Sequence, residues 1–281
     1  MILVTGATGT IGREVIRLLP PDLQVRIMAR DPARVEGPPA NAEVVYGDYG
    51  DLRAVAQAMT GVSALFLVTN QVEEGDGRII RTARSAGVRH VVKLSAAAVA
   101  DPGAQDLITR WQRANEELLR GSGMTWTLLR PRSFMSNALS WAASVRTDGV
   151  VRALYGSSPN ACVAPGDVAE VAVRALTEPG HEGRIHTLTG PEALTAVGQT
   201  TELAALLSRP IRFEEATPGH MRDALRRRYP EPVVEALMAS ARRQLEGAKA
   251  GVEETVTVLT GRPATSFRTW AQGNIARFAP T

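Results

Sequence analysis

Short apolar runs and amphipathic stretches alternate along the first half of the chain. Six runs are β-branched or apolar and are bounded by Gly, Pro or Asp, which predicts strands at residues 1–5, 24–29, 43–46, 64–68, 90–95 and 125–129. Amphipathic stretches that end at Gly or Pro predict helices at residues 12–19, 52–59, 77–86 and 107–120. Repeated strand–helix units form parallel sheets with right-handed crossovers. The pattern therefore predicts an α/β fold, a doubly wound parallel sheet with helices on both faces.

The alternation changes after about residue 150. A turn-rich stretch at 151–163 is followed by segments typical of helices at 167–177, 199–207, 218–228 and 232–248 and of strands at 184–188 and 211–214. We assign residues 1–150 to a first domain, to which 167–190 and the C-terminal segment return. Residues 151–166 and 191–260 form a smaller C-terminal lobe in this interpretation.

Composition narrows the class of protein. The 281 residues are 44% hydrophobic and 22% charged, as in ordinary globular proteins, and no apolar run approaches the roughly 20 residues that a membrane helix needs. The chain begins without a cleavable leader, so we expect a cytoplasmic protein with no membrane partner. One cysteine, Cys162, excludes an internal disulfide. The net charge is only +3, and acids dilute the arginines near residues 222–228, so we expect no nucleic-acid partner.

A glycine-rich turn follows the first predicted strand. Residues 5–12 read Thr-Gly-Ala-Thr-Gly-Thr-Ile-Gly and open the first predicted helix. Gly6 permits the tight turn, Gly9 lets the backbone approach a pyrophosphate, and Gly12 lets the helix pack on the sheet. The first domain is therefore predicted to be a Rossmann domain, and the C-terminal lobe would hold the substrate. The expected cofactor-binding residues of the turn are Gly6, Thr8, Gly9, Thr10, Ile11 and Gly12.

The end of the second predicted strand favours NADP(H) over NAD(H). NAD sites usually place an acidic residue there to bind the ribose 2′-hydroxyl. This chain has Arg30, which suits a 2′-phosphate, and Arg13 is a second candidate contact. Asp31, one residue further, is the alternative ribose ligand, and Arg30 would then stack on adenine or face solvent.

Further segments stand in the order found in a known family. They are Gly47-Asp48-Tyr49, residues 121–131, Phe134-Met135-Ser136-Asn137, Asp167-Val168-Ala169 and Leu188-Thr189-Gly190-Pro191. With the glycine turn, they resemble the NmrA-like atypical short-chain dehydrogenases/reductases, which include type-2 quinone reductases and the NmrA regulator. The resemblance implies that Asp48 and Tyr49 lie near the adenine and that Pro131 and Phe134 border the nicotinamide. It also implies that Val68, Thr69 and Asn70 follow the cofactor at the end of the fourth predicted strand.

The catalytic dyad of the wider dehydrogenase group is absent. That group uses Ser with Tyr-x-x-x-Lys, but none of the tyrosines at positions 46, 49, 155 and 229 has Lys four residues later. The equivalent helix positions are Ile108 and Gln112, and Ser95 falls where the group's serine would stand. Ser95 and Gln112 are therefore the candidate catalytic residues, both expected at the cofactor. Gln112 can bind a ribose but cannot supply a proton.

The missing dyad limits the acceptor. Hydride transfer to a quinone leaves a weakly basic anion that water can protonate, whereas a simple ketone needs a positioned acid. We therefore predict an NAD(P)H-dependent oxidoreductase that acts on a quinone-like or conjugated aromatic small molecule. Phe134, Trp141, Tyr155 and Trp111 could line the acceptor slot or belong to the core.

Two other functions fit the same residues. A non-catalytic NAD(P) sensor of the NmrA type would also lack the dyad. The family resemblance and the composition also allow a tailoring reductase or oxygenase of an aromatic natural-product (polyketide) pathway. The four histidines lack metal-ligand spacing, so we expect no metal site. The oligomeric state stays open, and the sequence is compatible with a homodimer.

Overall fold

A computed structural model of the chain describes residues 1–69 and 75–279. These residues form two compact units. Unit 1 comprises residues 1–100, 109–131 and 165–187, and unit 2 comprises 101–108, 132–164 and 188–281. The domain boundaries inferred from the sequence stay a prediction, because compactness does not show which part folds alone or binds substrate.

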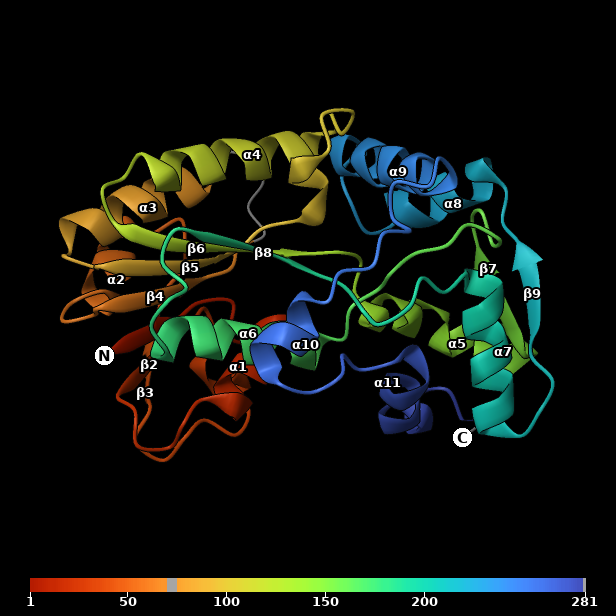
Figure 1. Ribbon diagram of the computed structural model, residues 1–281, viewed down its shortest axis with the longest axis horizontal. Helices are drawn as coiled ribbons and strands as arrows, with labels where there is room; N and C mark the ends of the chain where they lie inside the picture. Colours follow the sequence, from red (N-terminus) through yellow and green to blue (C-terminus); the bar gives the residue numbers. More distant parts are fainter. Residues whose placement is uncertain (70–74, 280–281) are drawn as a thin grey trace. The chain divides into compact units, whose positions relative to one another are not determined.

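Unit 1 contains most of a seven-stranded sheet with the order β3-β2-β1-β4-β5-β6-β8 (Figure 1). Its strands are β1 (Ile2–Val4), β2 (Val25–Ala29), β3 (Glu43–Tyr46), β4 (Ala64–Leu67), β5 (His90–Leu94), β6 (Thr125–Pro131) and β8 (Arg184–Leu188). The pairs from β3 through β6 are parallel. β1 pairs with both β2 and β4, so the strand order reverses there, where doubly wound sheets bind ligands. The predicted fold class is confirmed.

Apolar side chains pack on both faces of this sheet. Helices α2 (Leu52–Ala58), α3 (Gly75–Ser85) and α4 (Leu107–Arg120) cover one face, where a core cluster includes Leu3, Leu65 and Leu128. Helices α1 (Thr10–Leu18) and α6 (Pro165–Thr177) pack against each other on the opposite face. The nearly continuous burial along β1, β2, β4 and β5 thus supplies two apolar surfaces, as a doubly wound sheet requires.

Unit 2 has a small parallel sheet and two apolar clusters of its own. Strands β7 (Val150–Ala153) and β9 (Arg212–Glu215) pair in parallel. Its helices are α5 (Ala142–Asp148), α7 (Ala196–Leu207), α8 (Pro218–Arg226), α9 (Glu231–Leu245), α10 (Thr255–Thr260) and α11 (Phe267–Gly273). Phe267 and Leu203 belong to one cluster, and Val234 and Met238 belong to the other. Within the described ranges, no helix is long and apolar enough to cross a membrane.

His181, in the turn before β8, pairs with His186 of that strand. Nδ1 of His181 and Nε2 of His186 lie 3.1 Å apart, and the two rings meet edge to face. One nitrogen must donate and the other accept, so the pair requires at least one neutral ring. Burial above all, and then the charges of His181 and Arg184, lower the pKa of His186 to about 4.

This pair predicts a specific acid sensitivity. The pKa of His186 is lower in the folded chain than its ordinary value of about 6.5. The fold therefore favours the neutral form of His186. This contribution to the free energy of unfolding is fully present above about pH 6.5 and is lost as the pH falls towards 4. We expect His186→Gln to make the free energy of unfolding, measured with urea, fall less steeply between these values. His220→Gln, at an exposed position, is the control and should match the parent slope.

Candidate functional site

The glycine turn connects β1 to α1 and leaves the start of that helix open. Gly6 has a φ of +65°, a left-handed conformation that favours glycine. Its carbonyl accepts a hydrogen bond of 2.9 Å from the Gly9 N–H, which closes the turn. Gly9 is the N-cap of α1, and no side chain caps the helix. The first N–H groups of α1 thus remain available to an anion.

The backbone of the turn is tightly packed against α1. A Cβ atom at Gly12 would lie 2.1 Å from the Gly6 carbonyl oxygen, closer than any real contact. A Cβ at Gly9 would lie 3.1 Å from the same oxygen. Only glycine at position 12 lets α1 start this close to the end of β1, as the sequence predicted.

A cavity of about 190 Å³ opens at this turn. Its lining combines the ends of β1, β2, β3 and β4, in the residues Gly6, Ala7, Thr8, Gly9, Met28, Ala29, Arg30, Gly47, Tyr49, Val68 and Thr69. Seven of the residues predicted to bind cofactor are therefore neighbours here. Thr10 is the exposed first residue of α1, and Ile11 is buried beneath it. Asn70 lies outside the described residues.

Tyr49 holds two strand ends together at the cavity. Its hydroxyl donates to the Val68 carbonyl at 2.7 Å and accepts from the Gly6 N–H at 3.1 Å. Burial raises the pKa of Tyr49, although hydrogen bonds to Thr5 and Gly6 oppose the rise. The hydroxyl is thus committed to the backbone and is a poor proton donor. The Asp48 carboxylate is also committed, since Oδ1 accepts from the Gly50 N–H at 2.8 Å.

The two candidate ribose ligands after β2 have different surroundings. Arg30 is exposed, lines the cavity and acts electrostatically on Tyr49. Asp31 caps a short 3-10 helix, and its Oδ1 accepts from the Ala33 N–H at 3.2 Å. Arg13 has its Nη1 3.9 Å from an oxygen of Glu36. Of these side chains, the guanidinium of Arg30 is the one that borders the cavity.

A buried ion pair lies beside the predicted catalytic positions. Lys93 Nζ is 2.7 Å from Asp76 Oδ2, and both side chains are at most 1% exposed. Thr69 Oγ1 donates to the other oxygen of Asp76. Lys93 also donates to Gln112 Oε1 at 2.9 Å, which leaves the amide NH₂ of Gln112 to bind a ribose. The network therefore connects Gln112 to Thr69 in the cavity lining.

The hydroxyl of Ser95 belongs to a second buried network. Ser95 is 6% exposed, and its Oγ donates to Glu116 Oε1 at 2.6 Å. Glu116 also binds Arg130 and Arg120. Ser95 must give up this hydrogen bond before it can orient an acceptor, so its predicted role stays a prediction.

The structure separates the remaining predicted residues between the units. Pro131 is the buried last residue of β6 in unit 1, and Phe134 starts a 3-10 helix in unit 2. Trp141 and Tyr155 pack against the two apolar clusters of unit 2. Trp111 lies on α4 with its ring centroid 5.5 Å from Lys93 Nζ, and its indole nitrogen is buried without a hydrogen bond to any described residue.

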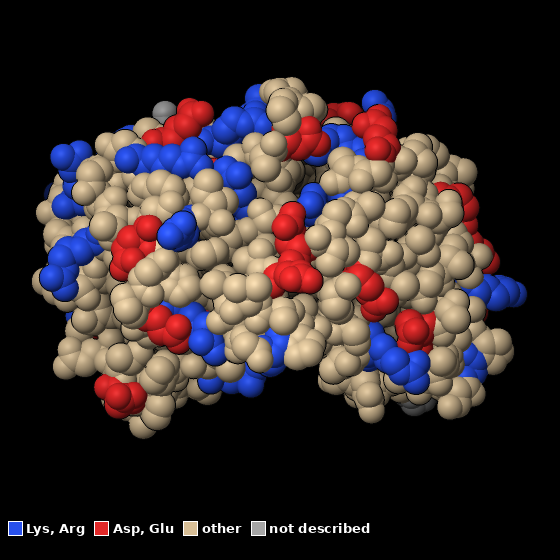
Figure 2. Space-filling model, viewed as in Figure 1, with Lys and Arg blue, Asp and Glu red and all other residues tan. Residues whose placement is uncertain are grey.

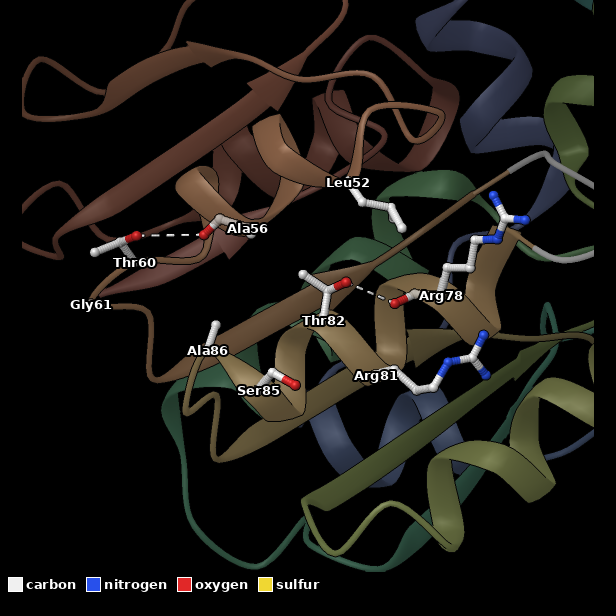
Figure 3. A pocket seen from close by; sticks show the side chains of 9 residues that line it. All are labelled: Leu52, Ala56, Thr60, Gly61, Arg78, Arg81, Thr82, Ser85 and Ala86. Atoms are coloured by element: carbon white, nitrogen blue, oxygen red, sulfur yellow. Dashed lines mark hydrogen bonds between the residues drawn. The ribbon is translucent and has the colours of Figure 1, made fainter.

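A second opening lies on the surface of unit 1. It encloses about 650 Å³ between α2 and α3 and includes none of the residues predicted to bind cofactor (Figure 3). The hydroxyls of Thr60 and Thr82 bind carbonyls of their own segments, those of Ala56 and Arg78.

Basic and acidic side chains are interspersed over the face in Figure 2. Across residues 1–69 and 75–279, no group of three or more metal-ligating side chains is placed to bind a metal ion.

Comparison with known proteins gives matches along the whole chain. A family model described as NAD(P)H-binding matches residues 6–179. The chain is 55% identical, over all 281 residues of both proteins, to a (4-alkanoyl-5-oxo-2,5-dihydrofuran-3-yl)methyl phosphate reductase from Streptomyces griseus subsp. griseus. It is 35% identical to an NAD(P)H azoreductase from Xenophilus azovorans, over 99% of each chain.

A solved structure shares the fold. It is that of an NADPH-dependent quinone oxidoreductase from Escherichia coli in complex with NADPH. The TM-score is 0.83 at 27% sequence identity, and the match covers 98% of this chain and 99% of that one. The resemblance to atypical short-chain dehydrogenases/reductases is thus confirmed.

The Asp76–Lys93 pair generates a prediction about stability. Lys93→Met leaves the Asp76 carboxylate buried and unpaired, which costs about 3–5 kcal/mol. We expect the free energy of unfolding in urea to fall by about that amount. The double variant Asp76→Asn with Lys93→Met should recover part of the loss, since no buried charge remains. Two single losses that simply add in the double variant would contradict the coupling.

Proposed function

The chain belongs to the NAD(P)H-binding family whose model matches residues 6–179, and within its activity as an NAD(P)H-dependent oxidoreductase we propose that it reduces an electron-poor carbon–carbon double bond in a small phosphate ester. The observation that carries this proposal is the 55% identity to the furanone phosphate reductase over the full length of both proteins.

Unit 1 fits a dinucleotide. The uncapped start of α1, with Gly9 as its N-cap, forms a cradle in which backbone N–H groups, rather than side chains, would face a pyrophosphate. Gly6, Thr8 and Gly9 would hold the phosphates there, and Gln112 would bind a ribose through its amide NH₂. When bound, the reduced nicotinamide supplies a hydride.

Reduction of this class of acceptor does not require the protein acid that the chain lacks. In the furanone named for the Streptomyces relative, the double bond joins the carbon that carries the phosphomethyl group to a carbon between two carbonyls. Hydride addition to the first carbon places an electron pair on the second, where both carbonyl oxygens share the charge. One proton from water completes the saturated product. Such a stabilised anion needs little help from a protein acid.

The positions of the four tyrosines are consistent with a reaction that uses no protein acid. Tyr46 and Tyr229 are 57% and 45% exposed, and Tyr49 is bound to the backbone. Tyr155 packs in the second cluster of unit 2. Lys93 is paired with Asp76, so it is not placed as the partner of a catalytic tyrosine. The chain's contribution to catalysis would be to bind and orient the reactants.

A quinone is the second candidate acceptor. The same argument applies to it, because its reduced anion is also delocalised and weakly basic. The full-length likeness to the Escherichia coli quinone oxidoreductase favours it. The lower identity, 27% against 55%, places it second.

For the cofactor we propose NADPH in preference to NADH. Arg30 borders the cavity with an exposed guanidinium, while the Asp31 carboxylate caps the neighbouring turn. A guanidinium binds a 2′-phosphate through charge-assisted hydrogen bonds, and NADH lacks that group.

Replacement of Arg30 tests this preference. We expect Arg30→Ala to raise the Kd of NADPH about tenfold or more and that of NADH only slightly, because one charge-assisted contact is worth roughly 1.5–3 kcal/mol. Titration calorimetry on both cofactors gives the two ratios. Arg34→Ala, four residues on and also exposed, is the matched control. Equal losses for the two cofactors at position 30 would assign the ribose to Asp31.

Steady-state kinetics test the acceptor and the absence of an acid. NADPH oxidation should be fast with a 3-phosphomethyl furanone that carries a second carbonyl, slower with a quinone, and negligible with a simple ketone. Tyr→Phe at positions 46, 49, 155 and 229 should each retain kcat/KM within about tenfold, against the roughly 10²–10⁴-fold loss expected for a missing acid. A loss of that size at one tyrosine, or ketone turnover equal to that of the furanone, would refute the proposal.

A further inference from the structure

Three basic residues of unit 2 meet at one short segment of backbone. Lys249 follows α9, and its carbonyl accepts a hydrogen bond of 2.9 Å from the Ala161 N–H. Arg132, the residue after β6, donates from Nη1 to the Ala248 carbonyl at 2.9 Å. Arg243, in the last turn of α9, accepts from the Ala248 N–H at 3.0 Å through its carbonyl. Hydrogen bonds to the backbone of residues 248 and 249 therefore bring the three residues together.

The charges of these side chains are incompletely balanced. Among the residues that the structure describes, none forms an ion pair or a hydrogen bond with Lys249 Nζ. Arg132 Nε is buried, also without a hydrogen bond in the described part of the chain. Arg243 pairs with Asp101 and has a side chain only 14% exposed. The cluster thus holds two cations with unused hydrogen-bond donors and one that an acid already binds.

The acidic residues near the cluster do not form ion pairs with Lys249 or Arg132. Asp106 acts electrostatically on Lys249, and Glu253 acts on Arg132. Neither carboxylate lies within 4.0 Å of the nitrogens of its cation, so neither forms an ion pair with it. The neighbouring Cys162 does not supply a thiolate, because burial raises its pKa to about 11.

The pKa values of two of these cations are consistent with the geometry. Burial in the first place, and then the positive charges of Arg243 and Arg132, lower the pKa of Lys249 to about 8. Burial likewise lowers the pKa of Arg132. Like charges that are held together and partly desolvated are costly unless an anion joins them.

We propose that Lys249, Arg132 and Arg243 form a binding site for the phosphate group of the phosphate-ester acceptor, an inference that rests on the proposed function. A phosphate carries between one and two negative charges at neutral pH, which matches the two unpaired cations. Its oxygens can accept from the ammonium of Lys249 and from the planar guanidinium of Arg132 together. The site gives the chain a means to select phosphorylated over unphosphorylated acceptors.

Lysine titration by NMR tests the site without any turnover. The chain has only two lysines, Lys93 and Lys249, so ¹³C-labelled lysine gives two side-chain signals, which Lys249→Arg assigns. Saturating phenyl phosphate should raise the pKa of Lys249 from about 8 towards the ordinary lysine value, because the bound anion stabilises the ammonium. Phenol is the uncharged control. An unchanged titration curve with phenyl phosphate would overturn the site.

Kinetics test its use in selection. The readout is the ratio of kcat/KM for a phosphorylated acceptor to that for its alcohol. Lys249→Met should lower this ratio by about tenfold to hundredfold, the worth of one charge-assisted hydrogen bond, and Lys249→Arg should restore most of it. Arg242→Met, an exposed arginine one residue before Arg243, removes the same charge and should leave the ratio unchanged. An equal fall in Arg242→Met would mean that long-range charge, and not the site, selects the phosphate.

The two proposals can fail separately. If the parent protein reduces neither furanone but phenyl phosphate raises the pKa of Lys249, the anion site stands and the proposed acceptor is wrong. If the parent reduces the phosphorylated furanone and Lys249→Met keeps the full ratio, the acceptor stands and the site is overturned.

Discussion

The close approach of α1 to the end of β1 is the constraint on which the cofactor-binding unit depends. The Gly6 carbonyl lies where a side chain at position 12 would have to be, so the helix can start there only with glycine. This geometry leaves the N–H groups of α1 open and lets Tyr49 reach both Gly6 and Val68. The turn thus fixes the relative positions of three strand ends and the helix start, which together form the cavity lining.

The sequence predicted the parts of the chain whose determinants are local. Apolar runs predict the strands of unit 1, and the spacing of the glycines at positions 6, 9 and 12 predicts the turn. The same local reasoning missed α5, α10 and α11 and interpreted β7 as part of a turn-rich stretch. These elements are short, and α5, β7 and α11 each contribute residues to the apolar cluster that includes Phe267, so tertiary packing rather than local propensity stabilises them.

Long-range electrostatics escaped the sequence analysis. Lys93 and Asp76 are 17 residues apart, and neither belongs to a recognised motif. A lysine inside the apolar run Val-Val-Lys-Leu was a usable signal, because a strand covered by helices on both faces gives its charge no route to solvent. Ser95 was identified from its position alone, and its hydrogen bond to Glu116 follows only from the folded structure.

The buried ion pair also restricts how this chain can have diverged. A lineage that replaces either Lys93 or Asp76 alone passes through an intermediate with an unpaired interior charge. That state forfeits a substantial fraction of the roughly 5–15 kcal/mol that keeps a domain folded. The two positions should therefore change together or remain together among descendants, and a proper test is their joint distribution across many sequences. Thr69 and Gln112 form hydrogen bonds with this pair, so we expect their positions to be constrained in the same way.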